Sequence, residues 1–446
     1  MTLPVEFTAR MKSMLGSDYD DFVAALSSPV PFAGVRRNPL KPCNIDLGEP
    51  DPGEPNLGEP IPWCENGFYI PKENVNGKQA IHLTGQIYYQ EPSAMAPIDA
   101  LPLCEGDCVL DLCAAPGGKS TGVATRLKNG ILFSNEIVSK RASILSENIE
   151  RLGITNTIVT NEAPASLQKH FPNFFDKIIV DAPCSGEGMF RKEPQAIEEW
   201  SLEHVKSCAD RQVKILSSAA EMLKSGGYII YSTCTFSIEE NEGVCQRFLS
   251  EHPSFELCDM PTLSMLSPGI GLEKARRAFP HKQKGEGHFV ALFHNTDTKE
   301  ALSRVKKQKQ APSDYIKAYR TFESENLNIK LDGTFLAFGE TLYLMPRDIS
   351  LDGIRVLRAG LELGTVQNNA KRFTPSHSLC MALGVNDFKT VHNLSDTELK
   401  LYLGGNTLQT SSKGWTAMIA DGYPIGWGKA TEGIMKNHYP KHLRFI

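Results

Sequence analysis

The sequence has no run of about 20 apolar residues, which is the length that a membrane-spanning helix requires. Its first 16 residues, MTLPVEFTARMKSMLG, carry charges where an export signal has its apolar core, so we expect a cytoplasmic protein with no membrane partner. It also has no Cys-x-x-Cys pair, and its 11 cysteines are not arranged as the paired knuckles of a zinc site. We therefore expect reduced thiols and no bound metal.

The chain has little net charge, because 52 Asp and Glu nearly balance 47 Lys and Arg. The balance differs along the chain: residues 301–446 hold 19 basic and 13 acidic residues, whereas residues 1–300 are net acidic. Such asymmetry suggests that the C-terminal third contacts a polyanion. With 446 residues, 41% of them hydrophobic, the chain is expected to be a globular protein of about three domains, acting as a monomer.

The two ends of the chain differ from its middle. Apolar residues recur at three- and four-residue spacing across residues 2–28, which predicts helix. Gly-Glu-Pro then occurs three times between Gly48 and Pro60, and prolines at that density predict an extended acidic surface segment. A polar, basic stretch at 294–314 predicts a linker or an exposed helix. Near the C-terminus, Gly-spaced aromatic and β-branched residues predict a small β-barrel.

Short Ile- and Val-rich runs alternate with helical segments in the middle of the chain. This alternation predicts an α/β domain with a parallel sheet that helices cover on both faces, and ligands of such sheets bind at the carboxyl ends of the strands. A helix over about 204–224 is expected to end before Gly226 and Gly227. Residues 255–260 and 288–293 predict an antiparallel hairpin at the sheet edge. The predicted parallel strands are 108–112, 130–136, 156–161, 176–183 and 228–234.

A glycine-rich turn follows the first predicted strand, in the sequence VLDLCAAPGGKST at 109–121. Small residues let a ligand approach the backbone, and the N–H groups at the start of the next helix can bind anionic or polar atoms of that ligand. The P-loop pattern fails because Cys113 stands where its first glycine is required, and no G-x-G-x-x-G dinucleotide pattern is present. Glu136 ends the next strand, 18 residues after Gly118, where an acidic residue can hold ribose hydroxyls. An adenosyl ligand without pyrophosphate is therefore favoured over NAD.

Two cysteines lie at the ends of neighbouring predicted strands. Cys184 follows Asp181 in DAPCSGEGMFRKEP, and Cys234 ends the run YSTC. A lone cysteine is usually a small buried hydrophobic residue, but two thiols at the carboxyl ends of adjacent strands would face one pocket. Ser237 and Glu240 follow, and their spacing predicts a capping box for the next helix. We infer that the two thiols share a site with the Asp181 carboxylate. This carboxylate could hydrogen-bond the edge of a planar ring or the amino group of a cofactor.

In order, these motifs resemble those of a known enzyme family. QIYYQEPSAMAP, DLCAAPGGKST, DAPCSGEGMFRKEP, YSTCTFSIEENE and RAFPHKQKGEGHFVALF are similar to the successive motifs of the NOL/NOP/Sun family of S-adenosylmethionine-dependent RNA (cytosine-C5) methyltransferases. The likeness covers the whole chain and is greatest to the bacterial branch that acts on small-subunit rRNA. It implies a Rossmann-like class I methyltransferase domain flanked by RNA-binding domains. The implied boundaries are 1–95 for an N-terminal RNA-binding domain, 96–298 for the methyltransferase domain, 299–380 for a linker and intermediate subdomain, and 381–446 for a PUA-like domain.

The resemblance also implies a role for each motif. In this family the Thr-Cys cysteine, here Cys234, adds to cytosine C6 and makes C5 nucleophilic, while the Pro-Cys cysteine, here Cys184, assists product release. Asp181 would contact the base or the cofactor. DNA cytosine methyltransferases use their Pro-Cys cysteine as the nucleophile, so the opposite assignment of roles stays open. Lys119 is a candidate electrostatic partner that would favour the thiolate of Cys234.

S-adenosylmethionine is the cofactor that the resemblance implies. Glu136 would hold its ribose, and Arg141, in the following helix, is a further candidate contact. Some relatives have Asp after the third strand, whereas this chain has Asn161, Glu162 and Ala163, so the contact to the adenine edge stays unassigned. The residues implied to contact the cofactor are Cys113, Ala114, Ala115, Pro116, Gly117, Gly118, Lys119, Glu136, Arg141 and Asp181.

Cations and aromatic rings would grip the RNA while the target base leaves the stack. The favoured residues are Arg191, Lys192, Lys436, Lys441 and Arg444, with Arg36, Arg37, Lys282, Lys284, Trp427 and Tyr439 as further candidates. The predicted activity is methyl transfer to cytosine C5 of 16S rRNA. A tRNA substrate is the nearest alternative, and a DNA methyltransferase and a non-catalytic ribosome-assembly factor are the others.

Overall fold

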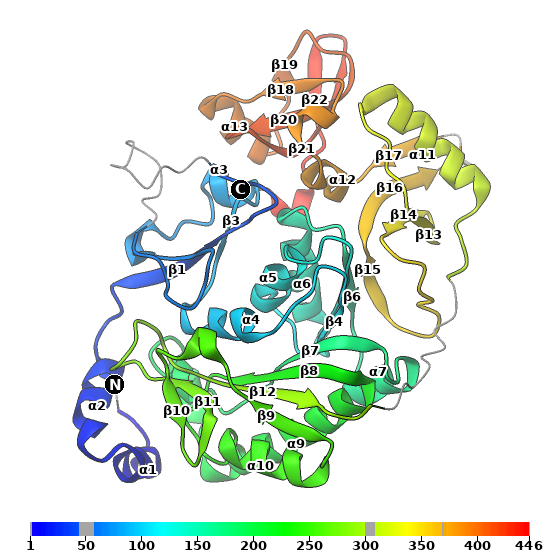
Figure 1. Cartoon of the computed structure of the whole chain (residues 1–446). Coiled ribbons are helices and arrows are strands. Elements are labelled where there is room, and N and C mark those ends of the chain that lie inside the picture. The colour runs from blue at the N-terminus through cyan, green and yellow to red at the C-terminus, as the bar shows by residue number, and fades with distance from the viewer. Residues whose placement is uncertain (1, 44–57, 299–307, 368–369, 371, 446) are drawn as a thin grey trace.

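The computed structural model describes residues 2–43, 58–298, 308–367, 370 and 372–445 (Figure 1). Most of the Gly-Glu-Pro segment and most of the basic half of the predicted linker lie outside these residues, at 44–57 and 299–307. Among the described helices, none combines the length and the apolar character needed to cross a bilayer.

The centre of the molecule is a ten-stranded sheet whose five middle strands are parallel. They are β4 (Cys108–Asp111), β5 (Ile131–Asn135), β6 (Thr157–Thr160), β7 (Phe175–Asp181) and β8 (Leu223–Thr233). Their order across the sheet is β8-β7-β4-β5-β6. All five coincide with predicted strands, apart from an earlier start of β8, so the predicted α/β, Rossmann-like fold class is confirmed.

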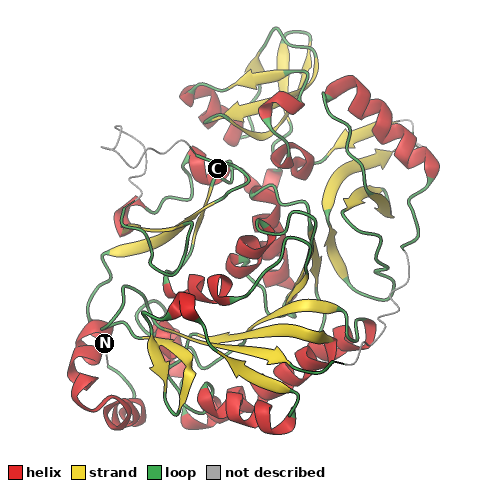
Figure 2. Cartoon of the chain, viewed as in Figure 1, coloured by secondary structure: helices red, strands yellow, loops and turns green. Residues whose placement is uncertain are grey.

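Helices cover both faces of this sheet (Figure 2). On one face Leu110 and Ile178 share a core with α7, α9 and α10, and on the other Val109 and Ile179 share a core with α4, α5 and α6. Because successive side chains of a strand point to opposite faces, each continuously apolar run supplies both cores. The helices are α4 (Ala96–Ala100), α5 (Gly118–Ala124), α6 (Ser139–Arg151), α7 (Pro164–His170), α8 (Pro194–Glu199), α9 (Leu202–Met222) and α10 (Glu242–Glu251).

Helix α9 ends before Gly226, as predicted, but at Met222 and not at residue 224, because Leu223 is already extended and begins β8. A predicted detail at the edge of the sheet needs correction. The predicted pairing of 255–260 with 288–293 exists, as β9 antiparallel to β12, but the two strands are not a hairpin because β10 and β11 lie between them in the chain. These strands are β9 (Phe255–Cys258), β10 (Ser267–Gly269), β11 (Leu272–Ala278) and β12 (His288–Asn295).

The N-terminal residues form two helices and a small sheet. Gly16, with a φ of 55°, separates the predicted helix into two helices that pack against the loops at the carboxyl ends of β7 and β8. The small sheet has the order β2-β1-β3. These elements are α1 (Val5–Leu15), α2 (Tyr19–Ser27), β1 (Phe32–Arg37), β2 (Gly67–Pro71), α3 (Ala80–Leu83) and β3 (Ile87–Tyr89).

The C-terminal residues form a four-stranded sheet and then a five-stranded sheet (Figure 1). The five-stranded sheet agrees with the predicted β-barrel region. The first part comprises α11 (Ser313–Asn326), β13 (Thr334–Phe338), β14 (Thr341–Met345), β16 (Leu361–Gln367), β17 (Arg372–Pro375) and α12 (His377–Ala382). The second comprises β18 (Val391–Asn393), α13 (Asp396–Leu403), β19 (Leu408–Gln409), β20 (Gly414–Ala420), β21 (Tyr423–Thr431) and β22 (Ile434–Asn437).

One C-terminal strand belongs to the central sheet. Strand β15 (Val356–Ala359) pairs antiparallel with β6, so a segment beyond the predicted methyltransferase domain completes that domain's sheet. Arg358 in this strand donates to Glu150 of α6 at 2.6 Å and to Ser378 of α12 at 2.7 Å. The first C-terminal part is thus attached to the central domain by backbone pairing and by a largely buried ion pair.

Candidate active site

Two thiols meet at the carboxyl ends of β7 and β8. Cys184 follows β7 by three residues, and Cys234 follows β8 directly. Because the strands are parallel neighbours, with Asp181 opposite Ser232, their following loops lie side by side. The two sulfur atoms are 3.4 Å apart and both residues are half-buried. The structure therefore brings the two predicted cysteines together.

Buried acidic side chains hold the two cysteine loops against each other. Glu240, after β8, accepts from the backbone N–H of Ser185 at 2.9 Å and from the Ser185 hydroxyl. Glu187, after Cys184, accepts from the backbone N–H of Phe236 at 2.9 Å. Burial raises the pKa of Glu187 to about 7, which favours a protonated carboxyl near neutrality. Sequence reasoning missed this clamp because it joins residues about 50 positions apart.

The predicted capping box is wrong. Helix α10 begins at Glu242 with Asn241 as its N-cap, and no side-chain cap forms there. Ser237 instead donates to Glu239 at 2.9 Å, while Glu240 faces the other cysteine loop. The spacing matched the motif, but the tertiary contact with Ser185 takes the carboxylate away from the helix end.

Asp181 lies beside the thiols and is strongly paired. Its carboxylate receives a 2.7 Å ion pair from Lys119 and a 2.7 Å hydrogen bond from Ser232. Burial by itself would raise the pKa of Asp181, but Lys119 and His288 outweigh it and hold that pKa well below its usual range. Lys119, predicted as the electrostatic partner of Cys234, therefore pairs with Asp181. The carboxylate is ionised and acts as a hydrogen-bond acceptor.

His288 is a site residue that sequence reasoning did not assign. It opens β12 and is 4% exposed, and its Nε2 lies 3.6 Å from Asp181 Oδ1. Burial and the nearby Lys119 lower the pKa of His288, so the ring is neutral at physiological pH. Neither ring nitrogen has a hydrogen-bond partner within the described residues, which is rare for a buried polar group. The motif containing His288 was visible, but the pairing of β12 with β8 that brings it here was not.

The glycine turn after β4 is held by two arginine side chains. Gly117 has a φ of 111°, a left-handed conformation that suits glycine. Arg36 of the N-terminal sheet donates to the Gly118 carbonyl at 2.6 Å, and Arg141 of α6 donates to the Ala115 carbonyl at 2.7 Å. Small residues and hydrogen-bonded carbonyls thus fix the shape of this turn. The predicted cofactor residues at 113–119 lie together in this turn.

Glu136 lies at the end of β5, next to the same turn. Its carboxylate accepts from the Val138 N–H at 2.9 Å and lies 3.2 Å from Arg141. Asn161 follows the third strand, where some relatives have Asp. Its side-chain amide donates to the carbonyls of Glu136 at 2.6 Å and Ile137 at 2.9 Å. Arg141 therefore links the turn to Glu136, and Asn161 fixes the backbone of that strand end.

Several residues predicted to contact RNA are packed against other parts of the protein. Arg191 is 10% exposed in its side chain and donates to Glu286 at 2.6 Å, to Ala25 and to Gly285, so it joins α2 to the loop before β12. Arg36 is buried against the glycine turn. Trp427 is a buried core residue whose indole donates to the Ser376 carbonyl at 2.8 Å, and Tyr439 is 5% exposed. These four side chains are largely buried and contact internal partners, so an RNA contact at any of them stays a prediction.

The remaining candidates are accessible but are spread over the molecule. Lys192 is 41% exposed and lies near the cysteine loop, 3.6 Å from Glu286. Lys436 and Lys441 are exposed on the C-terminal domain, and Arg444 is half-buried there, donating to the Tyr439 carbonyl. Arg37 lies over the Phe68 ring, Lys282 pairs with Asp18 and Lys284 pairs with Glu59. The C-terminal cations thus lie in and after the five-stranded C-terminal sheet, whereas the thiols belong to the central sheet.

Comparisons with known proteins now identify the family. The chain is 33% identical to "Ribosomal RNA small subunit methyltransferase F" of Vibrio vulnificus over 468 residues, covering 99% of this chain and 97% of the relative. The protein of that name in Escherichia coli K12 is 32% identical, with 99% and 96% coverage. The chain belongs to the 16S rRNA methyltransferase RsmB/F family. The resemblance seen in the motifs is thereby confirmed.

Family models match this RsmB/F-family chain in four consecutive parts. They are the N-terminal domain of 16S rRNA methyltransferase RsmF at 3–92, 16S rRNA methyltransferase RsmB/F at 98–294, the first C-terminal domain of RsmF rRNA methyltransferase at 321–383, and the methyltransferase RsmF PUA domain at 389–445. A solved methyltransferase homologue from Pyrococcus horikoshii is 28% identical, with a TM-score of 0.55, and covers 65% of this chain and 94% of its own. NSun6 from the same organism, at 24% identity and a TM-score of 0.55, covers 66% and 98% and shares the fold.

Proposed function

We propose that this protein transfers a methyl group from S-adenosylmethionine to C5 of cytosine in small-subunit rRNA. In this proposal Cys234 is the nucleophile, Cys184 assists product release and Asp181 contacts the base. The observation that carries it is the 3.4 Å separation of two thiols beside an ionised carboxylate at the carboxyl ends of β7 and β8. A single buried cysteine would need no such partner.

The chemistry explains why two thiols are useful. Cytosine C5 is a weak nucleophile until the Cys234 thiolate bonds to C6, which breaks the C5–C6 double bond and makes the ring an enamine. C5 then forms a bond to the incoming methyl carbon as that carbon's bond to the sulfonium sulfur breaks. A base takes the C5 proton, and the electron pair left behind restores the double bond as the Cys234–C6 bond breaks and the thiolate leaves. A second thiol next to the leaving sulfur is placed to assist that last step.

The electrostatics support this division of roles. The hydrogen bond to Cys234, together with burial, raises the pKa of Cys184 well above its usual value, so Cys184 stays a neutral thiol. A neutral thiol is a poor nucleophile but can donate a hydrogen bond to the sulfur beside it. Asp181, ionised and held by Lys119 and Ser232, can accept from the exocyclic amino group of cytosine.

The residues around the glycine turn fit an adenosyl cofactor. S-adenosylmethionine would supply the electrophilic methyl group when bound. Glu136 offers a carboxylate at the end of β5, and Arg141 couples it to the turn. Asp111 has one buried carboxylate oxygen with no hydrogen-bond partner among the described residues, and a Cβ on Gly118 would approach the Gln90 amide to 3.0 Å. A buried unpaired acceptor beside a turn that excludes side chains is consistent with a ligand that approaches the backbone.

The RNA substrate is proposed from the family and from the domain order. The curated relatives are named for the small-subunit rRNA, and the matched PUA domain carries the exposed Lys436 and Lys441. The N-terminal and C-terminal parts also touch, since Gln86 donates to Asp421 at 2.7 Å. We propose that the ends of the chain together grip rRNA while the central domain acts on the base, with the domains divided at residues 95, 298 and 380. We further propose that the protein is a cytoplasmic monomer.

Variants of the two cysteines test the proposal. Cys234→Ala is expected to abolish methyl transfer and adduct formation, because the bond to C6 cannot form. Cys184→Ala is expected to accumulate a covalent protein–RNA complex, seen as a denaturant-stable band in gel electrophoresis. Cys104→Ser, at an exposed cysteine outside the site, is the matched control and should remain active.

The substrates in this assay separate the alternatives. Naked 16S rRNA, assembled small subunits, tRNA and DNA are each supplied with labelled S-adenosylmethionine, and 5-methylcytosine is mapped in the products. If Cys184→Ala lost both methylation and adduct while Cys234→Ala stayed active, the assignment of roles would be reversed. If tRNA or DNA alone were methylated, the substrate part of the proposal would fail. Methylation of none by the wild-type protein would favour a non-catalytic assembly factor.

A further inference from the structure

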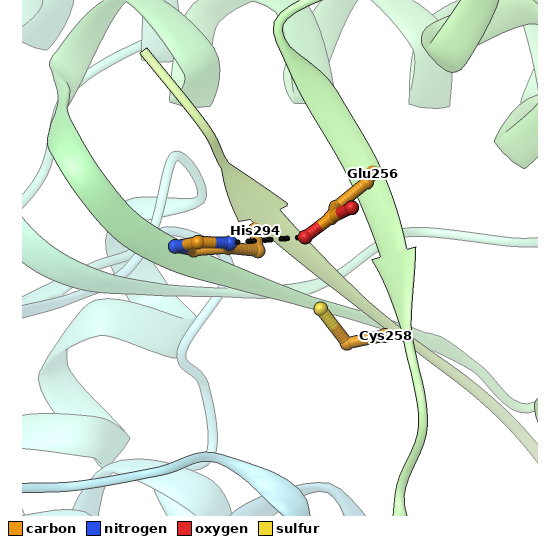
Figure 3. Close-up of side chains that lie close together, drawn as sticks. All are labelled: Glu256, Cys258 and His294. Carbon is orange, nitrogen blue, oxygen red and sulfur yellow. Dashed lines mark hydrogen bonds and ion pairs between the residues drawn. The ribbon is translucent and has the colours of Figure 1, made fainter. Parts of the chain in front are cut away.

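A second cluster of reactive side chains lies away from the thiol pair, on β9 and β12. Glu256 and Cys258 are two residues apart on β9 and therefore share a face, and His294 of β12 is directly opposite Glu256 in the strand register. One ligand atom from each, a carboxylate oxygen, a sulfur and an imidazole nitrogen, lie within 4.8 Å of one another. Figure 3 shows the three side chains directed toward one small space, with the Cys258 sulfur below the contact between His294 and Glu256.

The histidine of this cluster is held in place by its neighbours. The His294 ring stacks on the Tyr228 ring of β8, with 4.5 Å between the ring centroids and an interplanar angle of 21°. The Lys177 ammonium group of β7 lies 4.9 Å from the centroid of the same Tyr228 ring. His294 Nδ1 faces Glu256 at 3.3 Å. A side chain fixed by packing in this way is pre-positioned as a metal ligand. These side chains form a row across four neighbouring strands, which runs from Lys177 through Tyr228 and His294 to Glu256.

We propose that Glu256, Cys258 and His294 form a binding site for a divalent cation of the zinc class, with water as the fourth ligand. A thiolate and an imidazole together select borderline cations such as zinc over magnesium or calcium. Zinc binds sulfur at about 2.3 Å and nitrogen or oxygen at about 2.0–2.2 Å, so the three ligand atoms must approach one another by about 1 Å. Glu256 is 60% exposed and Cys258 is half-buried, so both side chains have room to turn.

The position of the cluster indicates what the ion would do. Strand β9 joins the central sheet through β12, outside the main strand order, and two of the three ligands are on it. A bound ion would link β9 to β12 through side chains as well as backbone hydrogen bonds. The site lies on a different part of the sheet from the thiols and does not depend on the proposed methyl transfer. It also departs from the expectation, based on cysteine spacing alone, that no metal is bound, because His294 lies 36 residues after Cys258 and meets it only through strand pairing.

Metal titration of the full chain tests the site. The metal-free protein is titrated with zinc, with free zinc followed by a chromogenic chelator, and separately with cobalt, whose thiolate charge-transfer absorption reports a bond to sulfur. The wild-type protein should bind one equivalent of either ion and show that absorption. Cys258→Ser and His294→Gln should each weaken binding by at least about tenfold, and Cys258→Ser should remove the absorption.

Matched variants decide between this site and the other thiols. Cys104→Ser and Cys234→Ser should bind zinc as the wild type does, because neither residue belongs to the cluster. Circular dichroism of each metal-free variant shows whether it is folded, and the positions are accessible enough that we expect all four to fold. No bound equivalent in the wild-type protein, binding that persists in both Cys258→Ser and His294→Gln, or binding lost in Cys234→Ser, would each overturn the proposal.

Discussion

The ring of Phe22 in α2 meets the ring of Phe236 edge-on, with 5.0 Å between the ring centroids. Phe236 follows Cys234 by two residues, so the N-terminal helices pack directly on the loop that carries this cysteine. Phe22 is completely buried and also contacts Phe7 and Phe279. The N-terminal part is therefore a support for the site as well as a candidate RNA-binding element.

Phe22→Ala should weaken both stability and activity. Removing a buried phenyl ring costs about 3–5 kcal/mol of unfolding free energy, and here it also frees the Cys234 loop. We expect a lower denaturation midpoint and a reduced rate of methyl transfer at a temperature where the variant is folded. Val5→Ala, at a side chain 83% exposed on α1, is the control and should change neither. Full activity in folded Phe22→Ala would show that the loop holds its shape without this contact.

Arg191→Ala should destabilise the fold, whereas Lys192→Ala should not. The arginine pairs at 2.6 Å with Glu286, which is 5% exposed, so its removal leaves a buried carboxylate with only the longer, exposed Lys192 contact, at a cost of about 3–5 kcal/mol. Lys192, one residue later and 41% exposed, should matter by less than about 0.5 kcal/mol. Chemical denaturation of both variants measures this. A stable Arg191→Ala protein that has lost RNA affinity would instead support the predicted direct contact of Arg191 with RNA.

Lys119→Met should move the acid limb of the activity profile to higher pH. Lys119 is the main group that lowers the pKa of Asp181, so without it burial raises that pKa and the carboxylate is lost at a higher pH. Activity at the acid end should fall by roughly tenfold or more, while the loss at alkaline pH should be smaller. His288→Asn should shift the limb in the same direction. An acid limb that stays in place in both variants would show that Asp181 does not control it.

Asp111→Asn should stabilise the protein most at alkaline pH. Burial raises the pKa of Asp111 to about 7, so the folded state favours the protonated form. The wild-type chain then loses stability as the pH rises from about 4 through 7, because the unfolded carboxyl ionises first. A shift of this size corresponds to on the order of 4 kcal/mol, and asparagine, which is always neutral, removes the penalty. Unfolding free energies at pH 5 and pH 8 give the comparison, and an equal effect at both would contradict the assignment.

Mild oxidation should join Cys184 to Cys234. With the sulfurs 3.4 Å apart, diamide can take the two thiol hydrogens as a small rotation of the side chains forms the sulfur–sulfur bond, which measures about 2.05 Å. Methyl transfer should stop and return on addition of dithiothreitol. Peptide mapping under non-reducing conditions identifies the bridge. Cys184→Ser should abolish the bridge, and inactivation that persists without it would point to another thiol.

Much of the site was predictable because local sequence carries it. The glycine turn at 113–119, Glu136, Asp181 and the two cysteines each follow a predicted strand, and the carboxyl ends of parallel strands meet at one edge. The clamp formed by Glu187 and Glu240 was not predictable, nor was the position of His288. Each depends on which residues of distant loops and strands become neighbours, and no local pattern marks this.

The sequence alone determined the α/β class, the five parallel strands and the order of the motifs, because strand and helix periodicity and glycine turns are local properties. Only the tertiary structure decided which candidate RNA-contact residues are exposed. Arg36, Arg191, Trp427 and Tyr439 are of residue types that often contact RNA, yet each packs against carbonyls, a carboxylate or aromatic rings inside the protein. It likewise decided that β15 joins the central sheet and that Glu256, Cys258 and His294 meet. Burial and strand register depend on the whole packed chain, and neither is fixed by a residue's neighbours in sequence.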